Sequence, residues 1–88
     1  MRRCVNCKKI QDIQGFYDIL SKKMRFPDWF GNNLDALSDV LGDVPDNTVL
    51  VLRHFDEMAE RIGPKAETLR KVLLDSAADN PGLTVKIL

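Results

Sequence analysis

The chain has 88 residues, of which 44% are hydrophobic and 30% are charged, as is typical of one small globular domain spanning residues 1–88. A chain of this size hides only about 60–65% of its unfolded surface, which argues against a large enclosed active site. Its net charge of zero argues against a dedicated nucleic-acid or anionic-membrane binder. No apolar stretch is long enough to span a membrane and no secretory leader is visible, so we expect a cytoplasmic protein.

The charges are unevenly distributed along the chain. Residues 1–25 carry seven basic residues against two aspartates, a net charge of +5. Residues 26–52 carry no Lys or Arg and a net charge of −5, from Asp28, Asp35, Asp39, Asp43 and Asp46. This asymmetry indicates a one-signed surface that faces a partner of opposite charge.

The first third of the chain predicts a strand followed by a helix. Residues 2–5 form a short edge-like strand, and Lys8 and Lys9 mark the turn after it. Asp12 is a candidate N-cap for a helix that ends before Pro27. The helix carries one apolar stripe at helical spacing, which we expect to be buried: Ile13, Phe16, Tyr17, Leu20 and Met24.

The remaining elements predict the fold class. Asn32 or Asn33 caps a second helix with Leu34 and Leu37 in its core stripe, and Gly42 is expected at its C-cap. Residues 48–52 lack alternation, which predicts a strand covered on both faces. Helices at 55–62 and 65–78 and a strand at 83–88 follow. Helices between consecutive strands predict an α/β fold, a three-stranded parallel sheet packed by about four helices.

Catalytic and metal chemistry find little support in the sequence. Cys4 and Cys7 form a lone C-x-x-C in which only His54 could add a third zinc ligand, so we expect two reduced thiols. No Ser or Cys nucleophile can be placed beside His54. Asp35 and Asp39 lack the third group that a Mg²⁺ site usually needs. We therefore expect no enzyme, no metal and no cofactor.

The second helix is the most informative element. Asp35 and Asp39 are four residues apart and project from one face of it. Such a pair alone is typical of a solvated face, but here every charge nearby in the sequence is negative. An acidic patch accelerates encounter with a basic cleft and then supplies charged hydrogen bonds. Trp29 and Phe30 adjoin it on a loop, and aromatic anchors beside charge are typical of an interface, so we expect at least one of them to face outward.

Residues 26–39, FPDWFGNNLDALSD, resemble the signature loop and second helix of the barstar family, the intracellular inhibitors of barnase-type ribonucleases. The resemblance covers essentially the whole chain, with the same element order. It implies a non-enzymatic inhibitor that is monomeric when free and whose partner is a small, extracellular-type, barnase-like ribonuclease. Asp39 is then expected where the substrate phosphate binds, with Asp35 beside it.

The same resemblance implies further contacts. Trp29 falls where an aromatic packs on the nuclease's histidine, and Asp75 near an acidic residue of the fourth helix that adds a peripheral contact. Ser38 stands where the protein that gives the family its name has a tryptophan. The expected partner-binding residues are Asp39, Asp35, Trp29, Phe30, Gly31, Asn33, Leu34, Ser38, Asp43 and Asp75.

One alternative of a different class uses the basic segment 1–25. Its seven cations could form an RNA- or phosphate-binding face, which would make the chain a binding module or adaptor without nuclease inhibition. The pairs Lys8-Lys9 and Lys22-Lys23 are equally consistent with solvated turns and helix ends. RNA binding that falls steeply with added salt would distinguish the two interpretations.

Overall fold

The computed structural model describes residues 1–28 and 30–88. Its sheet has three parallel strands in the order β1 (Arg2–Asn6), β2 (Thr48–Arg53) and β3 (Leu83–Ile87). Within the described residues, the strands are joined through a short 3₁₀ helix, η1 (Cys7–Lys9), and four α-helices: α1 (Ile13–Met24), α2 (Leu34–Gly42), α3 (Phe55–Ile62) and α4 (Lys65–Asp79). The predicted α/β class, strand direction and element order are confirmed.

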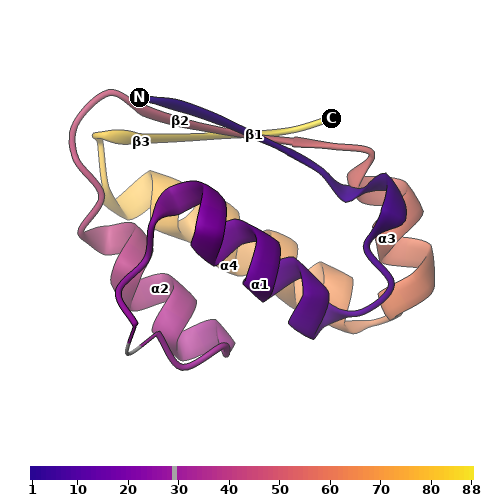
Figure 1. Cartoon of the computed structure of the whole chain (residues 1–88). Coiled ribbons are helices and arrows are strands. Elements are labelled where there is room, and N and C mark those ends of the chain that lie inside the picture. The colour runs from indigo at the N-terminus through magenta and orange to yellow at the C-terminus, as the bar shows by residue number, and fades with distance from the viewer. Residues whose placement is uncertain (29) are drawn as a thin grey trace.

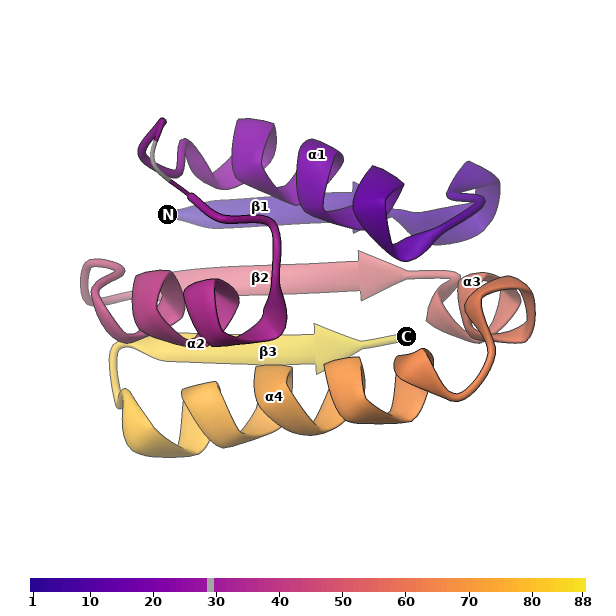
Figure 2. The same cartoon turned by 90° about the horizontal axis from the view of Figure 1, so that it is seen from below.

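The helices gather on one side of the sheet (Figures 1 and 2). Leu50 and Leu52 of β2 point toward them and are fully buried. Val51 points to the opposite face, where its partners in register are the exposed residues Cys4 and Lys86. The prediction that β2 is covered on both faces is therefore wrong. The apolar run reflects the central position of β2, because the neighbouring strands alone leave Val51 only 2% exposed.

Side-chain caps fix the starts of the first two helices. The Asp12 carboxylate accepts a 2.7 Å hydrogen bond from the Gly15 N–H at the start of α1, as predicted. Of the two candidates for α2, Asn33 is the cap: its Oδ1 accepts a 2.8 Å bond from the Ala36 N–H. Both helices then bury the expected apolar stripes against the sheet, although Ile13 and Leu34 are only partly covered.

The helix ends differ in detail from the sequence prediction. α1 stops because Arg25 adopts the left-handed conformation, with φ 56°, two residues before Pro27. α2 continues through Gly42, and Asp43 is its C-cap with φ −106°. The prediction of Gly42 as the C-cap is therefore wrong by one residue, since this end does not use the left-handed geometry that favours glycine.

The turn after β1 is held by Arg61 of α3. Its guanidinium donates hydrogen bonds to the backbone carbonyls of Cys7, Lys8 and Ile10, with 2.7 Å to Ile10 and 3.1 Å to Cys7. Cys7 is buried here, whereas Cys4 is exposed, and both are free thiols. Burial first, and the nearby Cys4 second, raise the pKa of Cys7 to about 11, against a smaller opposing effect of Arg61.

The described residues show neither a metal centre nor a membrane span. No group of three or more His, Cys, Asp or Glu side chains is arranged to hold a metal ion among them. No helix in this part of the chain has both the length and the apolar character required to cross a bilayer.

Candidate protein-binding site

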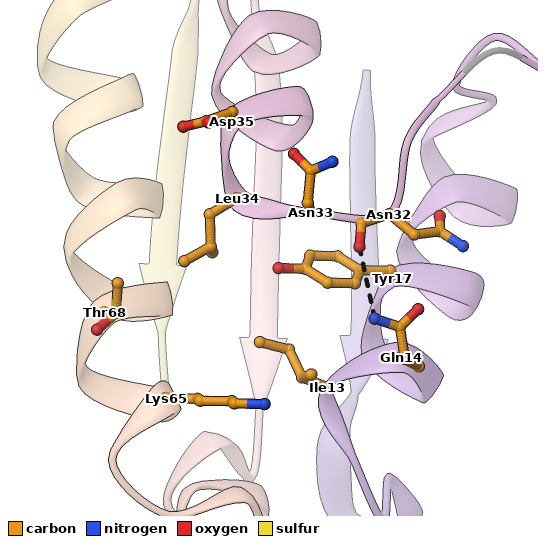
Figure 3. Close-up of a pocket in the computed structure, with 9 residues that line it drawn as sticks. All are labelled: Ile13, Gln14, Tyr17, Asn32, Asn33, Leu34, Asp35, Lys65 and Thr68. Carbon is orange, nitrogen blue, oxygen red and sulfur yellow. Dashed lines mark hydrogen bonds between the residues drawn. The ribbon is translucent and has the colours of Figure 1, made fainter.

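The entry to α2 is built around the side chain of Asn33. While its Oδ1 caps the helix, its Nδ2 donates a 3.1 Å hydrogen bond to the Gly31 carbonyl. One side chain thus holds both the loop and the first turn of the helix. The Gln14 amide of α1 donates to the Asn32 carbonyl at 3.5 Å, a second link between the loop and the helical layer (Figure 3).

The carboxylates of α2 and of its C-cap are exposed, and they form no ion pair within the described residues. Asp35, Asp39 and Asp43 all lie at the surface, as does Ser38 between them. The ion pairs formed by the described residues are Arg70–Asp56 and His54–Glu57, on α3, its cap and α4. The negative charge of α2 is therefore not neutralised by any described cation and remains available to a partner.

The loop before α2 is anchored by Phe30. Its ring lies 5.0 Å from that of Phe26 and 6.1 Å from that of Tyr17, between ring centroids, and it is half-buried. Phe30 therefore packs mainly within the molecule, as expected for one of the two adjacent aromatics. Trp29, the residue expected to contact the partner, lies outside the described residues.

A pocket of about 650 Å³ opens beside the first turn of α2, between α1 and the start of α4 (Figure 3). Ile13, Tyr17 and Leu34 supply its apolar wall, and burial raises the pKa of the Tyr17 hydroxyl. Asp35 and Lys65 place opposite charges at its two ends. The pocket can therefore receive a side chain that combines an apolar stem with a polar head.

Comparison with known proteins decides which family has this arrangement. Residues 1–87 match the family described as Barstar (barnase inhibitor). The chain belongs to the barstar family. A relative from Bacillus subtilis (strain 168), named "Putative ribonuclease inhibitor YrdF", is 33% identical over 73 residues, which cover 82% of this chain and 80% of the relative.

Membership in the barstar family confirms the resemblance seen in residues 26–39. Barstar-family proteins are inhibitors and not enzymes, and this membership supports a barnase-inhibitor-like role for the chain. The fold brings together Gly31, Asn33, Leu34 and Asp35, three of which line the pocket. Asp75 is exposed on α4, the helix that packs against α2.

Sequence reasoning missed several residues that this barstar-family chain places at the site. Gln14, Lys65 and Thr68 line the pocket from α1 and α4, and Tyr17 was expected only in the core. Nothing in the sequence indicates this pocket, because its walls come from three elements that meet only in the folded chain. The spacing of Asp35 and Asp39, by contrast, was visible in the sequence.

Proposed function

We propose that this chain inhibits a barnase-type ribonuclease by inserting α2 and the loop before it into the enzyme's cationic active site. The observation that carries the proposal is a row of exposed carboxylates on α2 and its C-cap, Asp35, Asp39 and Asp43, which form no ion pair with the described residues. A carboxylate imitates the charge and the acceptor geometry of a phosphate oxygen. Asp39 in this proposal occupies the place of a substrate phosphate, with Asp35 beside it.

The energetics of α2 support a binding role. Asp35 and Asp39, and again Asp39 and Asp43, are like charges four residues apart, an arrangement that destabilises a helix by about 0.2–0.5 kcal/mol per pair. Asp43 also lies at the helix C-terminus, where the dipole disfavours negative charge. These carboxylates therefore do not stabilise the free helix, whereas Arg and Lys groups of a nuclease would form charge-assisted hydrogen bonds with them.

The loop and the pocket add contact area on the same side of α2. Asn33 holds the Gly31 carbonyl and the first helical turn in a fixed relation, so little conformational entropy is lost when a partner binds. The adjacent pocket has Asp35 at its rim and an apolar wall at Leu34. An Arg of the partner fits this combination, because its stem is apolar and its guanidinium pairs with carboxylate.

Inhibition in this proposal requires occupancy and no chemical step. The inhibitor excludes RNA from the cleft by holding the groups that would bind the scissile phosphate. The partner is a small ribonuclease of the extracellular type, and the inhibitor is a cytoplasmic monomer when free. Trp29, Phe30, Ser38 and Asp75 contribute contacts around the carboxylates in this proposal.

The direct test is a titration of RNA cleavage. Purified inhibitor is added to each of several barnase-type ribonucleases, and the initial rate of cleavage of a fluorogenic RNA substrate is measured. We expect the rate to fall in proportion to added inhibitor and to approach zero near equimolar amounts for at least one enzyme. No inhibition across the set, at concentrations well above that of the enzyme, overturns the proposal.

A further inference from the structure

A second hollow, of about 430 Å³, lies where the C-terminal end of α1 meets the start of β1. Figures 1 and 2 both place these two ends next to each other. The hollow is lined by Cys4 and by five cationic residues, Arg2, Arg3, Lys22, Lys23 and Arg25. The fold thus collects five of the seven basic residues of segment 1–25, whereas Lys8 and Lys9 lie in η1, beyond the other end of β1.

The positive charge of this hollow is not neutralised within the described part of the chain. No Asp or Glu lines the hollow, and neither of the ion pairs there involves its cations. Lys22 and Lys23 lie in the last turn of α1, where the helix dipole stabilises positive charge, so their presence there needs no binding partner. The helix dipole does not explain the positive charges of Arg2 and Arg3, because these residues belong to strand β1. A concave surface of one sign concentrates its field and attracts counter-charge.

The basic surface continues from the hollow across the face of the sheet that carries no helix. Side chains alternate along a strand, so Arg2 lies on the same face as Cys4, and the register places Cys4 beside Val51 and Val51 beside Lys86. Arg53, two residues after Val51, shares that face. The three strands contain no Asp or Glu. An anionic chain that leaves the hollow therefore meets further cations.

We propose that this basic surface binds the phosphodiester backbone of RNA. Four of the five cationic residues that line the hollow are exposed. Their long side chains can adjust to the varying positions of phosphates along a flexible chain. No aromatic residue lines the hollow, which indicates contact with phosphates and not with bases. Its lining also lacks a large apolar side chain that would anchor it in a bilayer. The inference goes beyond nuclease inhibition, because the hollow and the pocket at Asp35 share no lining residue.

Fluorescence anisotropy of a labelled single-stranded oligouridylate tests the proposal, with the full chain titrated at low and at moderate salt. Neutralisation of about three to five phosphates predicts that a roughly fourfold rise in salt weakens binding by about ten- to a hundredfold. The variant Lys22→Glu/Lys23→Glu should weaken binding by about tenfold or more. The matched control is Lys8→Glu/Lys9→Glu, which makes the same charge change at another exposed helix end and should lose much less.

Several outcomes overturn the proposal. These are undetectable RNA binding at low salt, equal losses in the two double variants, or binding only to anionic phospholipid vesicles. Salt-sensitive self-association that Lys22→Glu/Lys23→Glu abolishes, without RNA binding, would assign the hollow to a second copy of the chain. Inorganic phosphate should compete only weakly, since it lacks the repeated charge. Asp39→Ala should lose nuclease inhibition and keep RNA binding, so the two proposals can fail separately.

Discussion

The side-chain amide of Asn80 donates a 3.0 Å hydrogen bond to the backbone carbonyl of Leu41 and so joins the end of α4 to the last turn of α2. Its Oδ1 accepts a 3.0 Å bond from the Gly82 N–H, which closes the turn before β3. The last carbonyls of a helix have no donor within the helix. The side chain of Asn80 supplies such a donor and thereby fixes the end of α2 against the rest of the fold.

Asn80→Ala should therefore lower the free energy of unfolding by about 1–2 kcal/mol, since it removes the side-chain hydrogen bonds to Leu41, Gly42 and Gly82 and leaves these partners unpaired. Urea unfolding followed by circular dichroism measures the loss. The matched control is Asp79→Ala, a change at the preceding exposed residue with no side-chain hydrogen bond among the described residues. If both variants unfold at the same urea concentration, Asn80 does not hold α2 in place.

Asp39→Ala should raise the inhibition constant for the partner ribonuclease by about ten- to a hundredfold. The basis is that a hydrogen bond to a charged group contributes about 1.5–3 kcal/mol, and each 1.4 kcal/mol changes affinity tenfold. Asp46→Ala is the matched control, because it removes the same charge from an exposed turn outside α2 and should change inhibition little. Both variants should unfold at urea concentrations close to that of the parent. Equal effects of the two substitutions on inhibition would contradict the occupancy mechanism.

Local signals in the sequence predicted those parts of the fold that local interactions decide. Asp12 caps α1 because its carboxylate reaches an N–H three residues away, a relation visible in the sequence. α3 is found at residues 55–62 as predicted, and Gly63, with φ 72°, is its C-cap. The spacing of Asp35 and Asp39 likewise required only the helical period.

The features that sequence reasoning missed depend on how distant elements meet. α2 ends at Gly42 without a left-handed residue, because the nearby Leu41 carbonyl accepts a hydrogen bond from the side chain of Asn80. Asn80 is remote in the sequence, so this partner could not be predicted from local signals. Whether β2 is covered on one face or two depends on where the helices pack. The pocket is likewise tertiary, so Lys65 gave no indication of its neighbours in the sequence. The basic face expected from segment 1–25 is found only in part, because the hollow gathers five of its seven cations.

The two hydrogen bonds of Asn33 can be separated by substitution. Asn33→Asp keeps the acceptor that caps α2 and loses the donor to the Gly31 carbonyl, so the free energy of unfolding should change little. Asn33→Ala loses both bonds and should be destabilised by about 1 kcal/mol. Urea unfolding distinguishes the two. If the Asp variant is as unstable as the Ala variant, the bond to Gly31, and not the cap, is the stabilising one.

Two glycines at the ends of elements should respond oppositely to alanine. Gly42 is helical, and an added Cβ there meets nothing within 4 Å, so Gly42→Ala should stabilise the protein by about 0.5–1 kcal/mol. A Cβ on Gly82 would lie 2.9 Å from the Asp46 Cα, so Gly82→Ala should be destabilising. Thermal and urea unfolding of both variants check the pair. A destabilised Gly42→Ala would indicate that this helix end needs glycine.

The buried thiol of Cys7 should make stability fall at alkaline pH. Its pKa is raised from the ordinary value of 9.0 to about 11 in the folded chain, chiefly by burial, whereas the unfolded thiol ionises near the ordinary value. Between these two values the folded state holds a proton that the unfolded state has lost, so the free energy of unfolding decreases as pH rises through this window and has its full value below it.

Urea unfolding of the parent and of Cys7→Ala across this pH range isolates the contribution of Cys7. The variant should be less stable at neutral pH, because it loses packing, and its stability should fall less steeply above pH 9.0. The two proteins differ only at residue 7, so the difference between the two curves reports the contribution of Cys7. The Cys4→Ser variant, altered at the exposed thiol, removes the smaller of the two effects that raise the Cys7 pKa, so its curve should lie between the other two and nearer to that of the parent. Parallel curves for the parent and Cys7→Ala would show that burial does not hold the Cys7 proton.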